Sequence, residues 1–176
     1  DSHSDTWDTY FGGFKYTHGT PFRRAIEENL IDPKKYVILG LRGGLYDPDD
    51  MTWAREQGIT IITTDEYYKM GFEEAMIITK DVLGDTPTYL TFDIDGIDPT
   101  FAPGTGTPEV GGFNVRESQM IIRDLVNINF IGADVVEVSP PFDINNMTSL
   151  VGATIAFEIL CTLTKTNIWL KNLKNI

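Results

Sequence analysis

Short apolar segments alternate with longer amphipathic segments along this chain of 176 residues, and this alternation most constrains its fold. Four segments rich in β-branched and other apolar residues are predicted strands, at 36–41, 59–63, 88–92 and 131–138. They are apolar on both faces, as strands of a parallel sheet are when helices cover both of its sides. We therefore predict a single α/β domain over 1–176, with three α/β/α layers and a mainly parallel sheet.

Local signals indicate where helices start. A Thr or Asp before a proline, at 20–21 and 47–48, gives an N-cap followed by a residue suited to the first helical position. The residue pairs at 63 and 66 and at 114 and 117 have capping-box spacing. A last helix is predicted from about Thr148 to Thr164, with Ile155, Ile159 and Leu160 at helical spacing.

The formal net charge of −12 argues against nucleic acid as a partner, because no basic patch is available to meet phosphate groups. A negative field suits a cationic substrate, although acidity also keeps a soluble protein in solution. No segment approaches the run of about 18 apolar residues that a membrane helix needs, and the first residues lack a signal-peptide pattern. The single cysteine, Cys161, cannot form an internal disulfide, so we expect a cytoplasmic protein that binds no membrane.

The first five residues, Asp-Ser-His-Ser-Asp, concentrate acidic and imidazole groups. Residues two apart share a face in extended chain, so Asp1, His3 and Asp5 are expected to point the same way. Two carboxylates and an imidazole that converge destabilise one another unless a cation lies among them. A solvated polar segment is the alternative, and this motif alone does not decide between the two.

A second acidic cluster follows the predicted strand 88–92. Asp93 and Asp95 share a face at the carboxyl end of that strand, where ligands bind in parallel α/β sheets. A solvated turn is the alternative; an EF-hand calcium loop does not fit, because Gly96 stands too early and Gly104 replaces the final glutamate. Four carboxylates and one imidazole in the two clusters suit Mn²⁺ better than Zn²⁺, and are enough for two ions that share carboxylates.

These motifs resemble the signatures of the ureohydrolase family, which includes arginases and agmatinases. The segments 1–5 and 92–99 are similar to its two signature motifs, 101–112 to its substrate-side loop, and 133–140 to the strand that carries its guanidinium-binding glutamate. The resemblance spans nearly the whole chain and favours the agmatinase branch. It implies an arginase-like fold, and hydrolysis of a guanidino group to urea with two Mn²⁺ ions per active site, Ni²⁺ being the substitute.

The resemblance also assigns metal ligands to residues of this chain. It implies that Asp1, Asp5 and Asp93 hold one ion. His3 and Asp95 complete the second, with Asp1 and Asp93 bridging the two ions.

Three further residues match functional positions of the family. His18 corresponds to its proton-shuttling histidine, Glu137 to the residue that binds the guanidinium group, and Thr107 to a residue lining the same pocket. Glu137 ends an apolar strand, where an unpaired buried carboxylate is costly, so an internal arginine partner is the alternative to a guanidinium substrate.

The expected substrate is a small cationic guanidino compound, and the candidates differ in the group that trails the guanidinium. Agmatine, 4-guanidinobutanoate, 3-guanidinopropanoate and guanidine itself remain open. The segment 6–10 is a candidate for reading this tail. Asp8 is suited to an amine there, and Arg23, Arg24 or Arg42 to a carboxylate.

One departure from the family concerns its first metal ligand, a histidine on an earlier strand that 1–176 does not contain. We therefore expect 1–176 to be the C-terminal majority of a single catalytic domain, poorly soluble or inactive by itself. A zinc deacetylase of the same fold and a catalytically inactive ureohydrolase-like subunit are the alternative functions. The family also implies a homo-oligomer, either a trimer or a hexamer.

Overall fold

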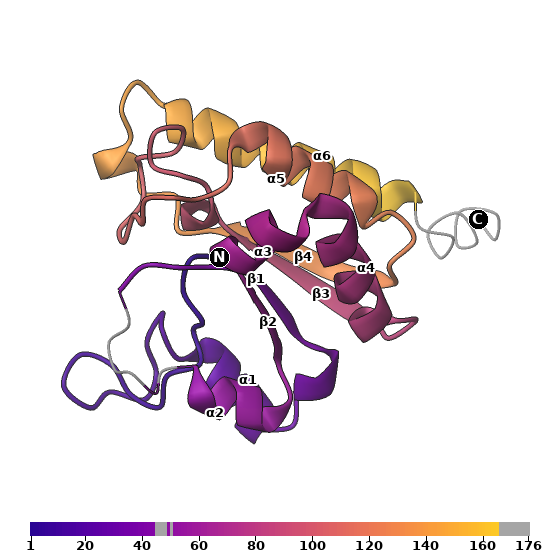
Figure 1. Cartoon of the computed structure of the whole chain (residues 1–176). Coiled ribbons are helices and arrows are strands. Elements are labelled where there is room, and N and C mark those ends of the chain that lie inside the picture. The colour runs from indigo at the N-terminus through magenta and orange to yellow at the C-terminus, as the bar shows by residue number, and fades with distance from the viewer. Residues whose placement is uncertain (45–48, 50, 166–176) are drawn as a thin grey trace, which may run out of the picture.

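The computed structural model describes residues 1–44, 49 and 51–165, and strands alternate with helices along them (Figure 1). The strands are β1 (Val37–Leu41), β2 (Thr60–Thr63), β3 (Thr88–Asp93) and β4 (Phe130–Val136). Each predicted strand is therefore present, with its bounds shifted by no more than two residues. The α/β class is confirmed.

The described strands pair in two parallel couples, β1 with β2 and β3 with β4, rather than in one continuous sheet. Leu39 lies opposite Ile62 in the first couple, and Phe92 lies opposite Val135 in the second. Parallel pairing brings the carboxyl ends of neighbouring strands to the same edge, where ligands bind in this class of fold.

Six helices connect and cover these strands within the described ranges. They are α1 (Pro21–Glu27), α2 (Thr52–Gln57), α3 (Thr64–Met70), α4 (Phe72–Leu83), α5 (Val115–Asp124) and α6 (Met147–Lys165), with short 3₁₀ turns η1 (Pro33–Lys35), η2 (Ile94–Gly96) and η3 (Pro140–Phe142). Both predicted capping boxes are present, at the starts of α3 and α5. Helix α1 begins at Pro21 as predicted, although the Thr20 hydroxyl contacts the carbonyls of Lys15 and Thr17 instead of capping. The predicted start at 47–48 lies outside the described residues.

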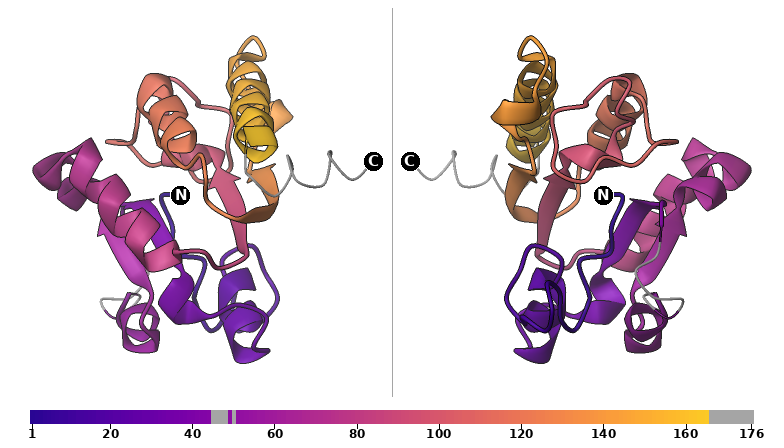
Figure 2. Two further views of the ribbon diagram at one scale, coloured as in Figure 1. Left: turned by 90° about the vertical axis from the view of Figure 1, so that its right-hand side faces the viewer. Right: turned by 90° about the vertical axis from the view of Figure 1, so that its left-hand side faces the viewer.

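The helices bury the apolar side chains of both strand couples. Ile26 of α1 and Ala54 of α2 pack with Ile38 on one face of β1–β2. Tyr67 of α3 and Met76 of α4 belong to the cluster on the other face, which gives the expected three layers around this couple. Helices α5 and α6 lie side by side over β3–β4, as Figures 1 and 2 show.

Helix α6 is long and apolar enough, by length and composition alone, to span a membrane, with a mean hydropathy of 1.5. It packs instead as a core helix, because Ile155 and Ile159 are buried and Glu158 accepts hydrogen bonds from Arg123 of α5. Leu160, predicted alongside them, is 59% exposed. Successive helical residues are about 100° apart, so Leu160 points away from the strands that Ile159 faces.

This arrangement predicts a large difference between two substitutions in α6. Ile155→Ala should lower the free energy of unfolding by about 2–5 kcal/mol, because it leaves a cavity in a fully buried position. Leu160→Ala, on the opposite side, should change it by about 0.5 kcal/mol or less. Thermal unfolding followed by circular dichroism measures both; equal destabilisation would contradict the assignment of the two faces.

Candidate metal centre

The 1–5 segment shows the predicted alternation of side chains. Ser2 and Ser4 are buried, whereas Asp1, His3 and Asp5 are half-buried and lie on the other side. No strand pairing with another described residue supports this segment, and the backbone leaves the extended conformation at Asp5, where φ is 52°. The predicted sharing of a face therefore holds without the segment being a β-strand.

Two aspartates stand at the end of β3, as predicted. Asp93 is the last residue of the strand, and its Oδ1 accepts a hydrogen bond from the Asp95 N–H at 2.9 Å, which starts the η2 turn. The exposed fractions are 4% for Asp93 and 1% for Asp95. Such deep burial of two carboxylates requires compensation by hydrogen bonds or by positive charge.

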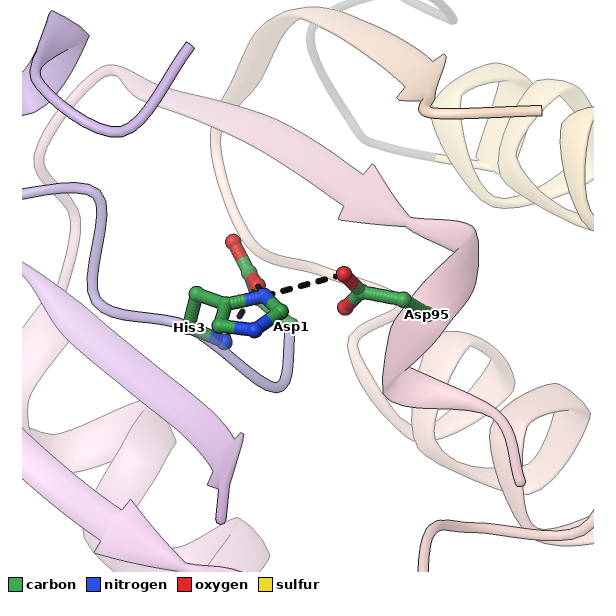
Figure 3. Close-up of side chains that lie close together, drawn as sticks. All are labelled: Asp1, His3 and Asp95. Atoms are coloured by element: carbon green, nitrogen blue, oxygen red, sulfur yellow. Dashed lines mark hydrogen bonds and ion pairs between the residues drawn. The ribbon is translucent and has the colours of Figure 1, made fainter. Parts of the chain in front are cut away.

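The 1–5 segment supplies part of that compensation. The N–H and hydroxyl of Ser2 donate to Asp95 Oδ1 at 3.0 and 2.7 Å. His3 Nδ1 lies 3.0 Å from Asp95 Oδ2, and the His3 N–H donates to Asp1 Oδ1 at 2.7 Å. Figure 3 shows Asp1 and His3 facing Asp95 from the neighbouring segment.

The five predicted ligands converge in two overlapping groups. Asp1, Asp5 and Asp93 form one group, and Asp1, His3 and Asp95 form the other. Within each group, the candidate ligand atoms all lie within 4.8 Å of one another. Asp1 belongs to both groups, whereas Asp93, which the resemblance also makes a bridge, belongs only to the first.

The electrostatics differ between these carboxylates. Burial raises the pKa of Asp5 to about 7, and burial together with the negative charge of Asp95 raises the pKa of Asp93 to about 8. Burial acts on Asp95 in the same direction, but the hydrogen bonds from His3 and Ser2 outweigh it and hold its pKa below the usual range. Burial lowers the pKa of His3, and the bond to Asp95 reverses this into a net increase. Crowded, desolvated carboxylates of this kind fit divalent cations, which supply the positive charge that the protein lacks here.

Two other predicted site residues, Thr107 and Glu137, lie in exposed positions. Thr107 donates to Asp95 Oδ2 at 3.4 Å. Glu137 directly follows β4, and the charge of Glu137 contributes to the raised pKa of Asp5. The assumption that Glu137 is buried is wrong, since the residue stands past the end of the strand, and no arginine pairs with it among the described residues.

His18 lies in an exposed loop between two aromatic rings. Its ring contacts those of Tyr10 and Phe11 edge-on, with centroids 5.5 and 5.4 Å away. Within the described part of the chain, no hydrogen bond or ion pair joins His18 to the five candidate ligands.

The charged residues predicted to read a substrate tail are engaged elsewhere. Asp8 Oδ1 accepts from Arg24 Nη2 at 3.0 Å, and Arg23 stacks 4.2 Å from the centre of the Trp53 ring. Arg42 donates to main-chain carbonyls at the end of β1, in the η2 turn and in the 107–112 segment. A tail carboxylate or amine would therefore have to displace an existing partner of any of the four.

A cavity of about 290 Å³ borders this cluster. It is lined by residues of the 1–7 segment, the end of β1 and its neighbours, including His3, Trp7, Arg42, Met51 and Asp65.

The sequence model of the Arginase family matches residues 1–162. The chain belongs to this family. It is 55% identical over 163 residues to guanidinopropionase and 46% identical to guanidinobutyrase, both from Pseudomonas aeruginosa, and covers 51% of each. Proclavaminate amidino hydrolase from Streptomyces clavuligerus superposes with a TM-score of 0.87 at 40% identity, over 95% of this chain and 54% of that one. The chain thus spans about half the length of these relatives.

Two residues of this arginase-family site were not predicted from the sequence. Ser2 donates two hydrogen bonds to Asp95. The predicted alternation placed Asp1 and His3 on one side of the segment, and this already implied that Ser2 points to the other side. Glu109 approaches His3, with Oε1 lying 4.0 Å from Nε2. No sequence signal marked Glu109 apart from its place in the substrate-side loop.

The raised pKa values predict that protons compete with metal at this centre. A divalent cation must displace the protons of Asp5 and Asp93, whose pKa values of about 7 and 8 keep them protonated in acid. Affinity for Mn²⁺ should therefore fall as the pH is lowered from 8.5 to about 6, with net proton release on binding. Calorimetric titrations in buffers of different ionisation enthalpy measure the released protons, and an affinity independent of pH would contradict the assignment.

Proposed function

We propose that the full-length protein is a ureohydrolase that cleaves the guanidino group of a small guanidino acid to urea and an amine, using two Mn²⁺ ions. The observation that carries the proposal is the pair of ligand groups that share Asp1. Asp5 and Asp93 would complete the first ion's ligands, and His3 and Asp95 the second's. Oxygen ligands with a minority of nitrogen favour Mn²⁺, and we expect Ni²⁺ to be the best substitute.

The two ions, when bound, would lower the pKa of a water molecule toward neutrality and so provide the nucleophile. Two groups of the protein would act on the substrate directly. The Glu137 carboxylate accepts hydrogen bonds from the guanidinium group and orients it. Its φ of 64°, uncommon for a residue other than glycine, is of the strained kind that clusters at functional sites. Thr107, whose hydroxyl donates to Asp95 Oδ2 at 3.4 Å, would contact the substrate beside that carboxylate.

Hydrolysis forms a bond between the water oxygen and the guanidinium carbon, and breaks the bond from that carbon to the alkyl-bearing nitrogen. The leaving nitrogen must gain a proton to depart as an amine. His18 is the proposed proton carrier, because an imidazole ring can both accept and donate a proton, and its exposed loop gives it access to solvent.

The names of the relatives support a guanidino acid over agmatine as the substrate, since guanidinopropionase and guanidinobutyrase are 55% and 46% identical to this chain. Because Asp8, Arg23, Arg24 and Arg42 are already engaged, we propose that the tail extends along the cavity beside Trp7 and Met51.

A urea-release screen of the full-length protein with 3-guanidinopropanoate, 4-guanidinobutanoate, agmatine and guanidine tests this choice. Acetate release from an acylated amine would instead support the deacetylase, and bound metal without any turnover would support an inactive subunit. Light scattering on the same sample checks the predicted homo-oligomer.

Asp93→Asn should abolish both metal binding at one position and urea release, because the neutral amide is a poor ligand for Mn²⁺ in a site that relies on charge. Asp81→Asn, which neutralises an exposed aspartate of α4, is the matched control and should behave as wild type. Metal content by elemental analysis and urea release report the result. Activity that survives complete removal of metal by a chelator would refute the proposal.

Glu137→Gln and His18→Asn should separate binding of metal from turnover. Both variants should retain two ions, since neither residue belongs to a ligand group among the residues that the structure describes. Glu137→Gln should lose most turnover through loss of the charged partner of the guanidinium, and His18→Asn should slow turnover by about 10²–10⁴-fold at most. Loss of metal in either variant would show that a ligand has been mistaken for a substrate or proton residue.

A further inference from the structure

Arg42 holds together segments of the chain that are distant in sequence. It directly follows β1, and its guanidinium donates hydrogen bonds from all three nitrogens to main-chain carbonyl oxygens. These carbonyls belong to the end of β1, to the η2 turn with the residue after it, and to the substrate-side loop, at Gly40, Asp95, Gly96, Ile97, Glu109 and Val110. The two shortest bonds, both 2.7 Å, go from Nη2 to the carbonyls of Asp95 and Glu109.

The backbone of Arg42 reaches a further segment. Its N–H donates to the Ser2 carbonyl at 3.1 Å, and so ties β1 to the 1–5 segment that carries Asp1 and His3. Arg42 thus contacts both metal-ligand segments and the loop that holds Thr107 and Glu109.

The Arg42 guanidinium fits against the loop because residue 112 is a glycine. A Cβ atom at Gly112 would lie 2.7 Å from Arg42 Cζ and 2.7 Å from the Asp98 nitrogen. The Asp98 carboxylate accepts from the Gly111 and Gly112 N–H groups at 2.7 and 3.1 Å, which holds this part of the loop against the guanidinium.

The choice of acceptors matters for the metal centre. Arg42 bonds to the carbonyl of Asp95 rather than to its carboxylate, which remains free to face His3 and the candidate metal. A planar group with five N–H donors can satisfy carbonyls in several directions, whereas a lysine ammonium offers three donors at one point. The arrangement also means that Arg42 is not available to bind a substrate carboxylate.

We propose that Arg42 is a positioning residue that fixes the Asp95 turn and the 107–112 segment against the 1–5 segment, and thereby sets the affinity of the second metal position and of the substrate. The inference rests on the proposed two-metal function. Arg42 would act through main-chain geometry. Removing a geometric effect and removing a charge effect change the affinity for Mn²⁺ in opposite directions.

The two effects can be told apart because a positive charge near carboxylates weakens the binding of cations. If Arg42 acted only through its charge, then Arg42→Met would bind Mn²⁺ more tightly and Arg42→Lys would be unchanged. If it positions the turn, then both variants bind Mn²⁺ more weakly.

The experiment titrates Mn²⁺ into the metal-free full-length protein by calorimetry, alongside the thermal unfolding midpoint. For Arg42→Met, Arg42→Lys and Gly112→Ala we expect one of the two ions to bind at least about tenfold more weakly, the usual size of effect for a group that orients a metal ligand. At saturating Mn²⁺, KM for the guanidino acid should still be raised, because the 107–112 segment remains displaced. Arg123→Met, which removes an arginine paired with Glu158 between α5 and α6, is the control and should bind both ions as wild type.

Unchanged or tighter Mn²⁺ binding in Arg42→Met, or wild-type binding in Arg42→Lys, overturns the inference. If Arg42→Met does not fold, then Arg42→Lys decides, since it keeps a long cationic side chain and removes only the planar set of donors. If the wild-type protein binds two ions and the variants bind them with the same affinity, then the positioning role is refuted and the proposed function is not. Wild-type protein that binds no metal and releases no urea refutes the proposed function and this inference together.

Discussion

Asp95 is a carboxylate with 1% of its surface exposed, and keeping it ionised and oriented there constrains everything around it. The Ser2 N–H and hydroxyl and the His3 ring stabilise its charge from one side, and Arg42 holds its main chain from the other. Asp5 and Asp93 receive less support, and their pKa values rise to about 7 and 8. The protein therefore stabilises the charge of Asp95 with its own hydrogen-bond donors. Asp5 and Asp93 would be stabilised as anions by a bound cation.

Much of the fold could be predicted from the sequence, because its signals are local. Strand bounds follow from apolar runs, and the capping boxes of α3 and α5 follow from residues three apart. Clustering of the candidate ligands was predictable for a similar reason, since Asp1, His3 and Asp5 alternate along one segment. The pairing of strands into two couples depends on contacts between distant segments, which no local pattern encodes.

The partners of charged side chains were the hardest feature to predict. Arg42 and Arg24 looked equally suited to a substrate carboxylate in the sequence, yet one binds carbonyls and the other binds Asp8. Each of these contacts joins elements whose relative placement is set only when the core forms. The exposure of Glu137 and Leu160 escaped prediction because an apolar flank in sequence does not determine which side of an element its neighbour faces.

The substrate-side loop shows how such contacts divide a functional segment into rigid and open parts. At its start, the Gly104 N–H donates to the Thr148 hydroxyl at 2.8 Å, and the Gly104 carbonyl accepts from Ser139 N–H at 2.7 Å, so α6 and the segment between β4 and η3 hold it. At its end, Arg42 and Asp98 hold it in turn. The exposed residues 106–108 lie between these anchors and carry Thr107 beside Asp95. We therefore expect substitutions at 106–108 to leave the candidate metal ligands in place, because the anchors and not the loop centre maintain the Asp95 turn.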